Sequence, residues 1–149
     1  MICCTFAGHR NILHPHADAK VEAALRELLD KDDVFTFYSG GMGEFDALCA
    51  CTVRNLQAHR SEKQIRLYLI EPYMKQSINI GGQWLHSLYD EIIVPEELVG
   101  IHYKSAIAKR NQWMIDRCQY LISYVHRDFG GAYHSVRYAQ RRGLNIISI

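Results

Sequence analysis

The sequence lacks the signatures of several common ligand-binding α/β proteins. It contains no G-x-x-x-x-G-K-[ST] segment, and therefore no P-loop lysine or magnesium-binding hydroxyl. No G-x-G-x-x-G segment opens its first predicted helix, and no G-x-S-x-G nucleophile elbow is present. The sequence thus supports neither a kinase-like nucleotide triphosphatase, nor an ordinary NAD dehydrogenase, nor an α/β-hydrolase.

Paired cysteines, clustered metal ligands and long apolar runs are also missing. The five cysteines have no C-x-x-C spacing, which favours small core residues in a reducing cytoplasm. His14 and His16 form only a pair, with no third histidine beside them, so we predict no metal site. No apolar run approaches the roughly 18 residues of a membrane span. We therefore expect a cytoplasmic protein with no membrane partner.

The sequence has little net charge. Its 17 basic residues nearly cancel its 16 acidic ones and leave a formal charge of +1. A dedicated nucleic-acid binder usually carries a basic excess or an extended basic stripe. The balance of charges therefore predicts against nucleic acid as a partner.

The order of apolar segments predicts alternating strands and helices. The periodicity predicts strands at 2–7, 34–38, 65–70, 91–95, 120–125 and 145–149, and helices at 17–30, 45–59, 104–118 and 133–143, with a short helix at 81–89. Such alternation is typical of right-handed βαβ units. We predict a single Rossmann-like α/β domain over residues 1–149, with three layers and a mostly parallel sheet.

Three polar, glycine-bearing loops directly follow predicted strands. Their sequences are GHR (8–10), SGGMG (39–43) and HRDFGGAYHS (126–135). The carboxyl ends of parallel strands meet at one edge of the sheet, so we expect these loops to converge on one crevice. Glycine lets the backbone approach a ligand, and the free N–H groups that begin the following helix favour an anion.

Asp46 and Arg110 are two charged candidates near this crevice. Asp46 lies in the first turn of a predicted helix, where it could bind a ribose, fix Arg10 or serve only as a helix-start charge. Arg110 falls on an otherwise apolar helix face. A buried arginine needs an anionic partner, and either a protein carboxylate or a ligand phosphate satisfies this requirement.

Four segments together resemble a known family. TFAGHR (5–10), YSGGMGEFDALCA (38–50), AKRNQWMIDRCQYLISYV (108–125) and GGAYHSVRYAQRRGLNIISI (130–149) are similar to the YpsA-like group of the SLOG superfamily, which includes the DprA DNA-processing protein and the LOG phosphoribohydrolases. The resemblance spans nearly the whole chain and is weakest at 71–103. It implies a Rossmann-like fold that binds a nucleotide-type ligand, with no further cofactor.

The resemblance and the three loops together predict a set of ligand-binding residues. These are Gly8, His9, Arg10, Ser39, Gly40, Gly41, Gly43, Asp46, Arg110, Asn111, Gly130, Gly131 and Tyr133. The resemblance places Met114 with Arg110 and Asn111 in an R-x-x-x-M helix. Tyr133 offers a ring for base stacking and a hydroxyl for a phosphate, or it packs on the sheet edge as a loop aromatic.

The chain departs from the LOG enzymes at their signature P-G-G-x-G-T-x-x-E. Here Tyr133, His134 and Arg137 replace the third glycine, the threonine and the glutamate. A guanidinium opposes the oxocarbenium-like state that a carboxylate stabilises. The missing glutamate argues against LOG-type catalysis, although Asp46 or Asp128 could replace it.

Three functions follow in order of preference. The first is binding or sensing of a nucleotide-derived small molecule, related to ADP-ribose or NAD, without strong catalysis. The second is a nucleoside-phosphate N-glycosidase of the phosphoribohydrolase type, and the third is DprA-like binding of single-stranded DNA. The aromatic-rich segment 70–89 also predicts a homo-oligomer, most simply a dimer.

Overall fold

The computed structural model describes residues 1–74 and 87–149. Within these residues the chain forms one six-stranded sheet in the order β4-β3-β2-β1-β5-β6, and all five neighbouring pairs are parallel. The strands are β1 (Ile2–Gly8), β2 (Val34–Ser39), β3 (Gln64–Ile70), β4 (Glu91–Ile93), β5 (Tyr120–Tyr124) and β6 (Asn145–Ser148).

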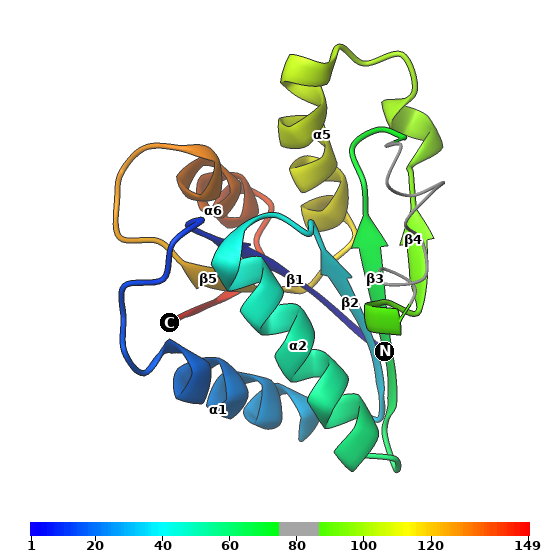
Figure 1. Ribbon diagram of the computed structural model, residues 1–149, viewed down its shortest axis with the longest axis vertical. Helices are drawn as coiled ribbons and strands as arrows, with labels where there is room; N and C mark the ends of the chain where they lie inside the picture. The colour runs from blue at the N-terminus through cyan, green and yellow to red at the C-terminus, as the bar shows by residue number, and fades with distance from the viewer. Residues whose placement is uncertain (75–86) are drawn as a thin grey trace.

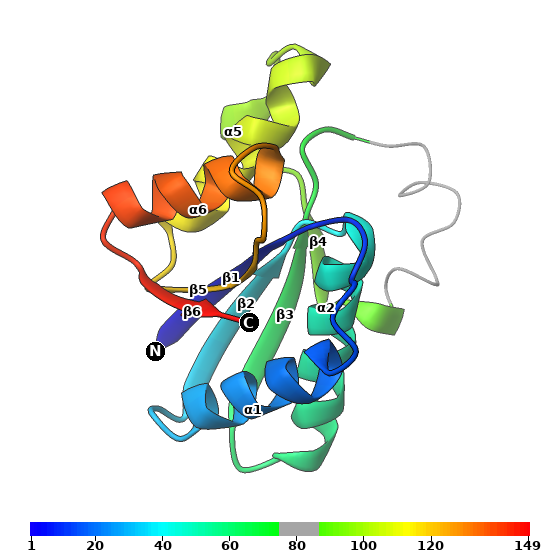
Figure 2. The same cartoon turned by 90° about the vertical axis from the view of Figure 1, so that its left-hand side faces the viewer.

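Helices cover both faces of this sheet and complete three layers. They are α1 (Ala17–Leu29), α2 (Gly43–His59), α5 (Tyr103–Asp116) and α6 (Gly131–Arg141), with a 3-10 turn at Glu96–Leu98. Figures 1 and 2 show α1 and α2 on one face and α5 and α6 on the other. The arrangement is a single Rossmann-like α/β fold.

Burial explains why these segments fold as they do. Central strand β1 is buried from Cys3 to Ala7 because helices cover both of its faces. Helix α1 buries a stripe that includes Val21, Leu25 and Leu28 against the sheet. Burial of each such leucine stabilises the fold by about 1.5–3 kcal/mol.

The structure confirms the predicted alternation and refines its boundaries. Helices α2 and α6 each begin two residues before the predicted start, because the glycines at 43 and 131 already belong to the helices. The sheet is entirely parallel in the described residues. Four cysteines are buried, but Cys51 is exposed. Most of the predicted helix at 81–89 lies outside the described residues.

The strand order creates a switch point between β1 and β5. The chain leaves β1 toward α1 on one face and leaves β5 toward α6 on the opposite face (Figure 2). The carboxyl ends of two such strands open a crevice where ligands of this fold class bind. In residues 1–74 and 87–149, no helix is both long and apolar enough to cross a membrane. The cytoplasmic location stays a prediction.

Candidate functional site

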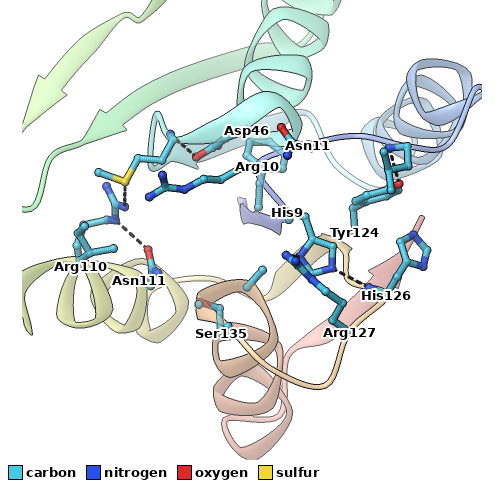
Figure 3. A pocket seen from close by; sticks show the side chains of 18 residues that line it. His9, Arg10, Asn11, Asp46, Arg110, Asn111, Tyr124, His126, Arg127 and Ser135 are labelled. Atoms are coloured by element: carbon cyan, nitrogen blue, oxygen red, sulfur yellow. Dashed lines mark hydrogen bonds between the residues drawn. The ribbon is translucent and has the colours of Figure 1, made fainter.

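A pocket of about 560 Å³ opens at this switch point. Figure 3 shows His9, His126 and Arg127 on one side of the pocket, with Arg110 and Asn111 on the other. The lining residues come from β1, β5, α2, α5 and α6 and from the loops that follow β1, β2 and β5: Phe6, Gly8, His9, Arg10, Asn11, Leu13, Met42, Asp46, Ile107, Arg110, Asn111, Tyr124, His126, Arg127, Gly130, Gly131, Ala132 and Ser135.

Tyr124, the last residue of β5, anchors the loop that follows β1. Its carbonyl accepts from the N–H of His9 (3.2 Å), and its hydroxyl accepts from the N–H groups of Leu13 (3.0 Å) and His14 (3.1 Å). The ring of Tyr124 also stacks on buried Phe45 of α2. Three backbone bonds to one core residue therefore fix the first loop at the pocket wall.

His9 meets two hydrogen-bond donors at the pocket wall. The backbone N–H of His126 donates to its Nε2 (2.9 Å), and Nη2 of Arg127 lies 3.0 Å from its Nδ1. A neutral imidazole has one ring proton and accepts at one nitrogen only, while a guanidinium never accepts. With Nε2 accepting, the proton sits on Nδ1 and faces Arg127. An anionic oxygen between Nδ1 and Nη2 would accept from both donors.

The electrostatic surroundings keep His9 neutral. The side chain is only 9% exposed. Burial, with the added repulsion of Arg127 and His126, lowers the pKa of His9 below its ordinary value of 6.5. The ring therefore remains a one-proton donor at neutral pH.

Arg10 and Asp46 both line the pocket, yet they are not paired with each other. The Arg10 guanidinium is exposed and, within the described residues, has no hydrogen bond or ion pair. The carboxylate of Asp46 accepts from Ser39 Oγ (2.8 Å) and from the Met42 N–H (3.2 Å). Burial raises the pKa of Asp46. Asp46 thus holds the loop after β2, and Arg10 is left available for a ligand.

The beginning of α6 adds backbone donors to the pocket. Gly130 caps the helix with φ of 95°, a conformation open to glycine, and no side chain caps the helix. In the described part of the chain, the N–H groups of Gly131, Ala132 and Tyr133 have no acceptor. No acidic residue lies in the first turn. Free N–H groups at a helix start attract anions.

The loop after β2 supports the pocket more than it lines it. Ser39 is fully buried, donates to Asp46 and accepts from the Gly41 N–H (3.2 Å). Gly43 has φ of 87°, and a Cβ there would lie 2.8 Å from the Arg10 Cα. Only Met42 of this loop lines the pocket. We expected three loops to converge on the pocket. The loops after β1 and β5 form much of its wall, whereas the loop after β2 mainly supports them.

Arg110 is buried as predicted, but its partners are neutral acceptors. It is 2% exposed and donates to the carbonyl oxygens of Gly40 and Ile70 (2.8 Å each) and to the Asn111 side chain (2.9 Å). Burial lowers the pKa of Arg110, and the charges of Asp46 and Glu71 oppose this effect. The guanidinium ties α5 to the ends of β2 and β3, where the chain turns past the pocket.

The structure brings together most of the predicted site residues. Those that line the pocket are Gly8, His9, Arg10, Asp46, Arg110, Asn111, Gly130 and Gly131. Those that do not line it are Ser39, Gly40, Gly41, Gly43 and Tyr133. The ring of Tyr133 lies against that of His134 instead (5.6 Å between centroids).

Several lining residues were not predicted. Arg127 and His126 are the first polar residues after β5, a position that the sequence does reveal. Ser135 ends the third predicted loop, whereas Asn11, Leu13 and Ile107 have no such signal and are brought to the pocket only by the tertiary fold. Among residues 1–74 and 87–149, no group of three metal-binding side chains is placed to hold a metal ion.

The fold and the site together define an α/β domain of the Rossmann type with a donor-rich pocket at its switch point. No protein-family model matches the chain. It is 23% identical over 135 residues to the uncharacterised SPβ prophage-derived protein YoqJ of Bacillus subtilis, a match that covers 82% of this chain and 79% of YoqJ.

Solved structures of DNA processing protein A (DprA) share the fold. The protein from Streptococcus pneumoniae superposes with a TM-score of 0.70 and 13% identity, over 99% of this chain and 50% of that one. DprA from Helicobacter pylori, whose structure describes a unique single-stranded DNA binding mode, gives 0.66 and 16%, over 99% and 64%. This chain therefore spans about half to two thirds of these proteins. The likeness shows that this chain shares the fold of DprA; a placement in the SLOG superfamily, whether YpsA-like or LOG, stays a prediction.

This comparison corrects the prediction against nucleic acid as a partner. The fold is shared with a protein whose structure is described by its single-stranded DNA binding mode. The prediction was wrong because a net charge of +1 averages the whole surface, whereas the local field at a cleft governs association. The predicted homodimer rested on segment 70–89, most of which lies outside the described residues.

Proposed function

We propose that this chain binds single-stranded DNA and holds a backbone phosphate in the pocket between β1 and β5. The observation that carries the proposal is the donor excess of this pocket. His9 and Arg127 present two donors to one space, and Arg10 has no partner in the described residues. Asp46, the carboxylate in the lining, is occupied by Ser39 and Met42. A phosphate oxygen supplies the acceptor that these groups lack.

An exposed aromatic ring beside the pocket suits a nucleobase. Phe129 is 59% exposed in the loop between β5 and α6, and the Arg127 guanidinium lies 5.0 Å from its ring centroid. Bases of single strands stack on such rings without sequence preference. Phe129 is therefore the proposed stacking residue, in place of Tyr133, for which base stacking was one of two alternatives from the sequence.

Single-stranded DNA binding replaces the two preferred hypotheses from the sequence. The likeness to DprA supports this third option. No comparison supports nucleotide sensing or phosphoribohydrolase activity. For hydrolysis, Arg137 stands where the resemblance places a glutamate, and the carboxylate of Asp46 already holds its own loop.

Fluorescence anisotropy with labelled oligothymidine tests the proposal. Arg10→Ala and Arg127→Ala each remove a cation from the pocket, and we expect each to weaken binding about tenfold, the value of one hydrogen bond to a charged group. Arg66→Ala, an exposed arginine on β3 that does not line the pocket, is the matched control.

Salt and competition distinguish the alternatives. Binding through phosphates weakens steeply as salt rises. Wild-type protein that bound no oligothymidine at low salt would refute the proposal. Binding of a mononucleotide with equal affinity, or release of free base from it, would favour the sensing or hydrolase hypothesis instead.

A further inference from the structure

A second cavity lies beside the phosphate pocket. It has a volume of about 590 Å³ and runs between α5 and α6, which lie on the same face of the sheet (Figures 1 and 2). Ile107, Asn111, Gly131 and Ser135 line both cavities. We name this second cavity the α5–α6 groove; it adjoins the pocket at the first turn of α6.

Among the residues that the structure describes, the lining of the α5–α6 groove is basic and contains no carboxylate. Lys104 from α5 and Arg137 and Arg141 from α6 line it, together with His134. Within the described residues, Lys104 and Arg137 have no side-chain hydrogen bond or ion pair, and Arg141 lies over the Tyr138 ring (5.7 Å). Three cations thus face one groove without a neutralising partner.

The arginines form a row that leads away from the phosphate pocket. Arg137 and Arg141 are four residues apart, so they lie on one side of α6. They stand roughly 9 Å and 15 Å along the helix from Gly131, at a rise of about 1.5 Å per residue. The row therefore starts about one helical turn beyond the free N–H groups of α6.

Arg137 and Arg141 do not take part in the nearest ion pair, which joins Asp116 and Arg142. Asp116 accepts a hydrogen bond from the Tyr138 hydroxyl (2.7 Å) and forms an ion pair with Arg142, whose Nε lies 3.0 Å from its Oδ1. Arg142 is therefore paired, while its neighbours along α6 are not. A salt bridge between exposed side chains contributes little to stability, so leaving Arg137 and Arg141 unpaired costs the fold little.

We infer that the α5–α6 groove carries the continuation of the bound DNA strand. This inference rests on the proposed function. A strand with one phosphate in the pocket presents its next phosphates to Lys104, Arg137 and Arg141, which act as point charges along the backbone. The protein therefore discriminates by strand length: short strands fill the pocket, and longer strands also occupy the groove.

Oligothymidines of about 4 and about 16 nucleotides, the range of single-strand site sizes, test this inference. Affinity is measured by anisotropy over a series of salt concentrations for wild type and Arg137→Ala/Arg141→Ala. For the longer strand, the slope of log affinity against log salt should fall in magnitude by about 1.4, since each lost contact contributes about 0.7. The slope for the shorter strand should not change.

Two further variants complete the test. Lys31→Ala/Lys109→Ala removes two exposed cations outside both cavities and should leave both slopes unchanged. Arg137→Lys/Arg141→Lys keeps the charges and should restore the wild-type slope for the longer strand.

The outcomes separate the two proposals. If binding of both strands depended on Arg10 but not on Arg137 and Arg141, the inference about the α5–α6 groove would be wrong. The proposed phosphate site in the pocket would still hold. If the Arg137→Ala/Arg141→Ala variant lost the same affinity for both strand lengths, the inference would also be wrong, because the groove would not contact only the longer strand. If wild type bound neither strand, the proposed function and the groove would fail together.

Discussion

Two glycine-rich loops of this chain begin helices at the same edge of the sheet, yet they differ in what the helix start contacts. At α2, the Glu44 N–H donates to the Arg10 carbonyl (2.8 Å), and the Glu44 carboxylate accepts from the Ile12 N–H (2.7 Å). At α6, the first N–H groups have no acceptor in the described residues, and Gly130 and Gly131 line the pocket. The first helix start is occupied by the protein itself; the second is available to a ligand.

Charge separates the two helix starts in the same way. The first turn of α2 contains Glu44 and Asp46, and that of α6 contains no acidic residue. Acidic side chains at a helix N-terminus satisfy its partial positive charge internally. Both loops are rich in glycine, so glycine content alone does not distinguish them, whereas the presence or absence of internal acceptors does.

The largest test of this comparison is Arg110→Ala. The substitution removes donors from the Gly40 and Ile70 carbonyls and leaves a cavity beneath the α2 loop. Each unpaired buried acceptor costs about 1–3 kcal/mol, so we expect the free energy of unfolding to fall by about 3–5 kcal/mol in urea titration. Lys109→Ala, at the exposed neighbouring position, should change it by less than about 0.5 kcal/mol. Equal effects would show that Arg110 is not a structural brace.

The second test compares glycines at the two helix starts. Gly43→Ala forces an alanine to φ of 87° and its Cβ toward the Arg10 backbone, and we expect a loss of about 2–4 kcal/mol by thermal or urea unfolding. Gly131→Ala has ordinary φ and open space, so stability should change little. Its methyl group would instead enter the pocket and weaken oligothymidine binding. If Gly131→Ala destabilised the protein as much as Gly43→Ala, the proposed difference between the two helix starts would be wrong.

The smallest expected effect is the contribution of His9 to the pH dependence of stability, because only one proton is bound or released. The folded state lowers the pKa of His9, so the unfolded chain binds this proton first as pH falls through 6.5. Stability from the neutral ring is complete above that pH and is lost as pH falls toward the folded pKa. His9→Gln retains an oxygen for the His126 N–H but does not titrate, and urea midpoints measured between about pH 7.5 and 5.5 should fall less than in wild type. If the urea midpoint fell equally in wild type and in His9→Gln, His9 would not be the source of this pH dependence.

The sequence revealed much of the fold but only part of the site. The alternation of apolar runs predicted six strands in the correct order along the chain, because burial between two helical layers imposes a local pattern. The pattern also identified Arg10 and Gly130 as residues at the carboxyl edge. It could not separate Arg110 as a brace from Arg110 as a ligand-binding group. That distinction depends on the carbonyl groups of Gly40 and Ile70, which are distant in sequence.

By itself, the sequence determined which loops reach the carboxyl edge of a parallel sheet. Short-range signals, namely apolar periodicity, glycine and the first polar residues after each strand, are sufficient for that. Only the tertiary structure decided which loop is open to a ligand. A donor is free or occupied according to contacts between distant segments, such as Glu44 with the Arg10 carbonyl or His9 with Arg127. Among the described residues, the first N–H groups of α6 are left without an acceptor, whereas at α2 the Glu44 N–H donates to the Arg10 carbonyl.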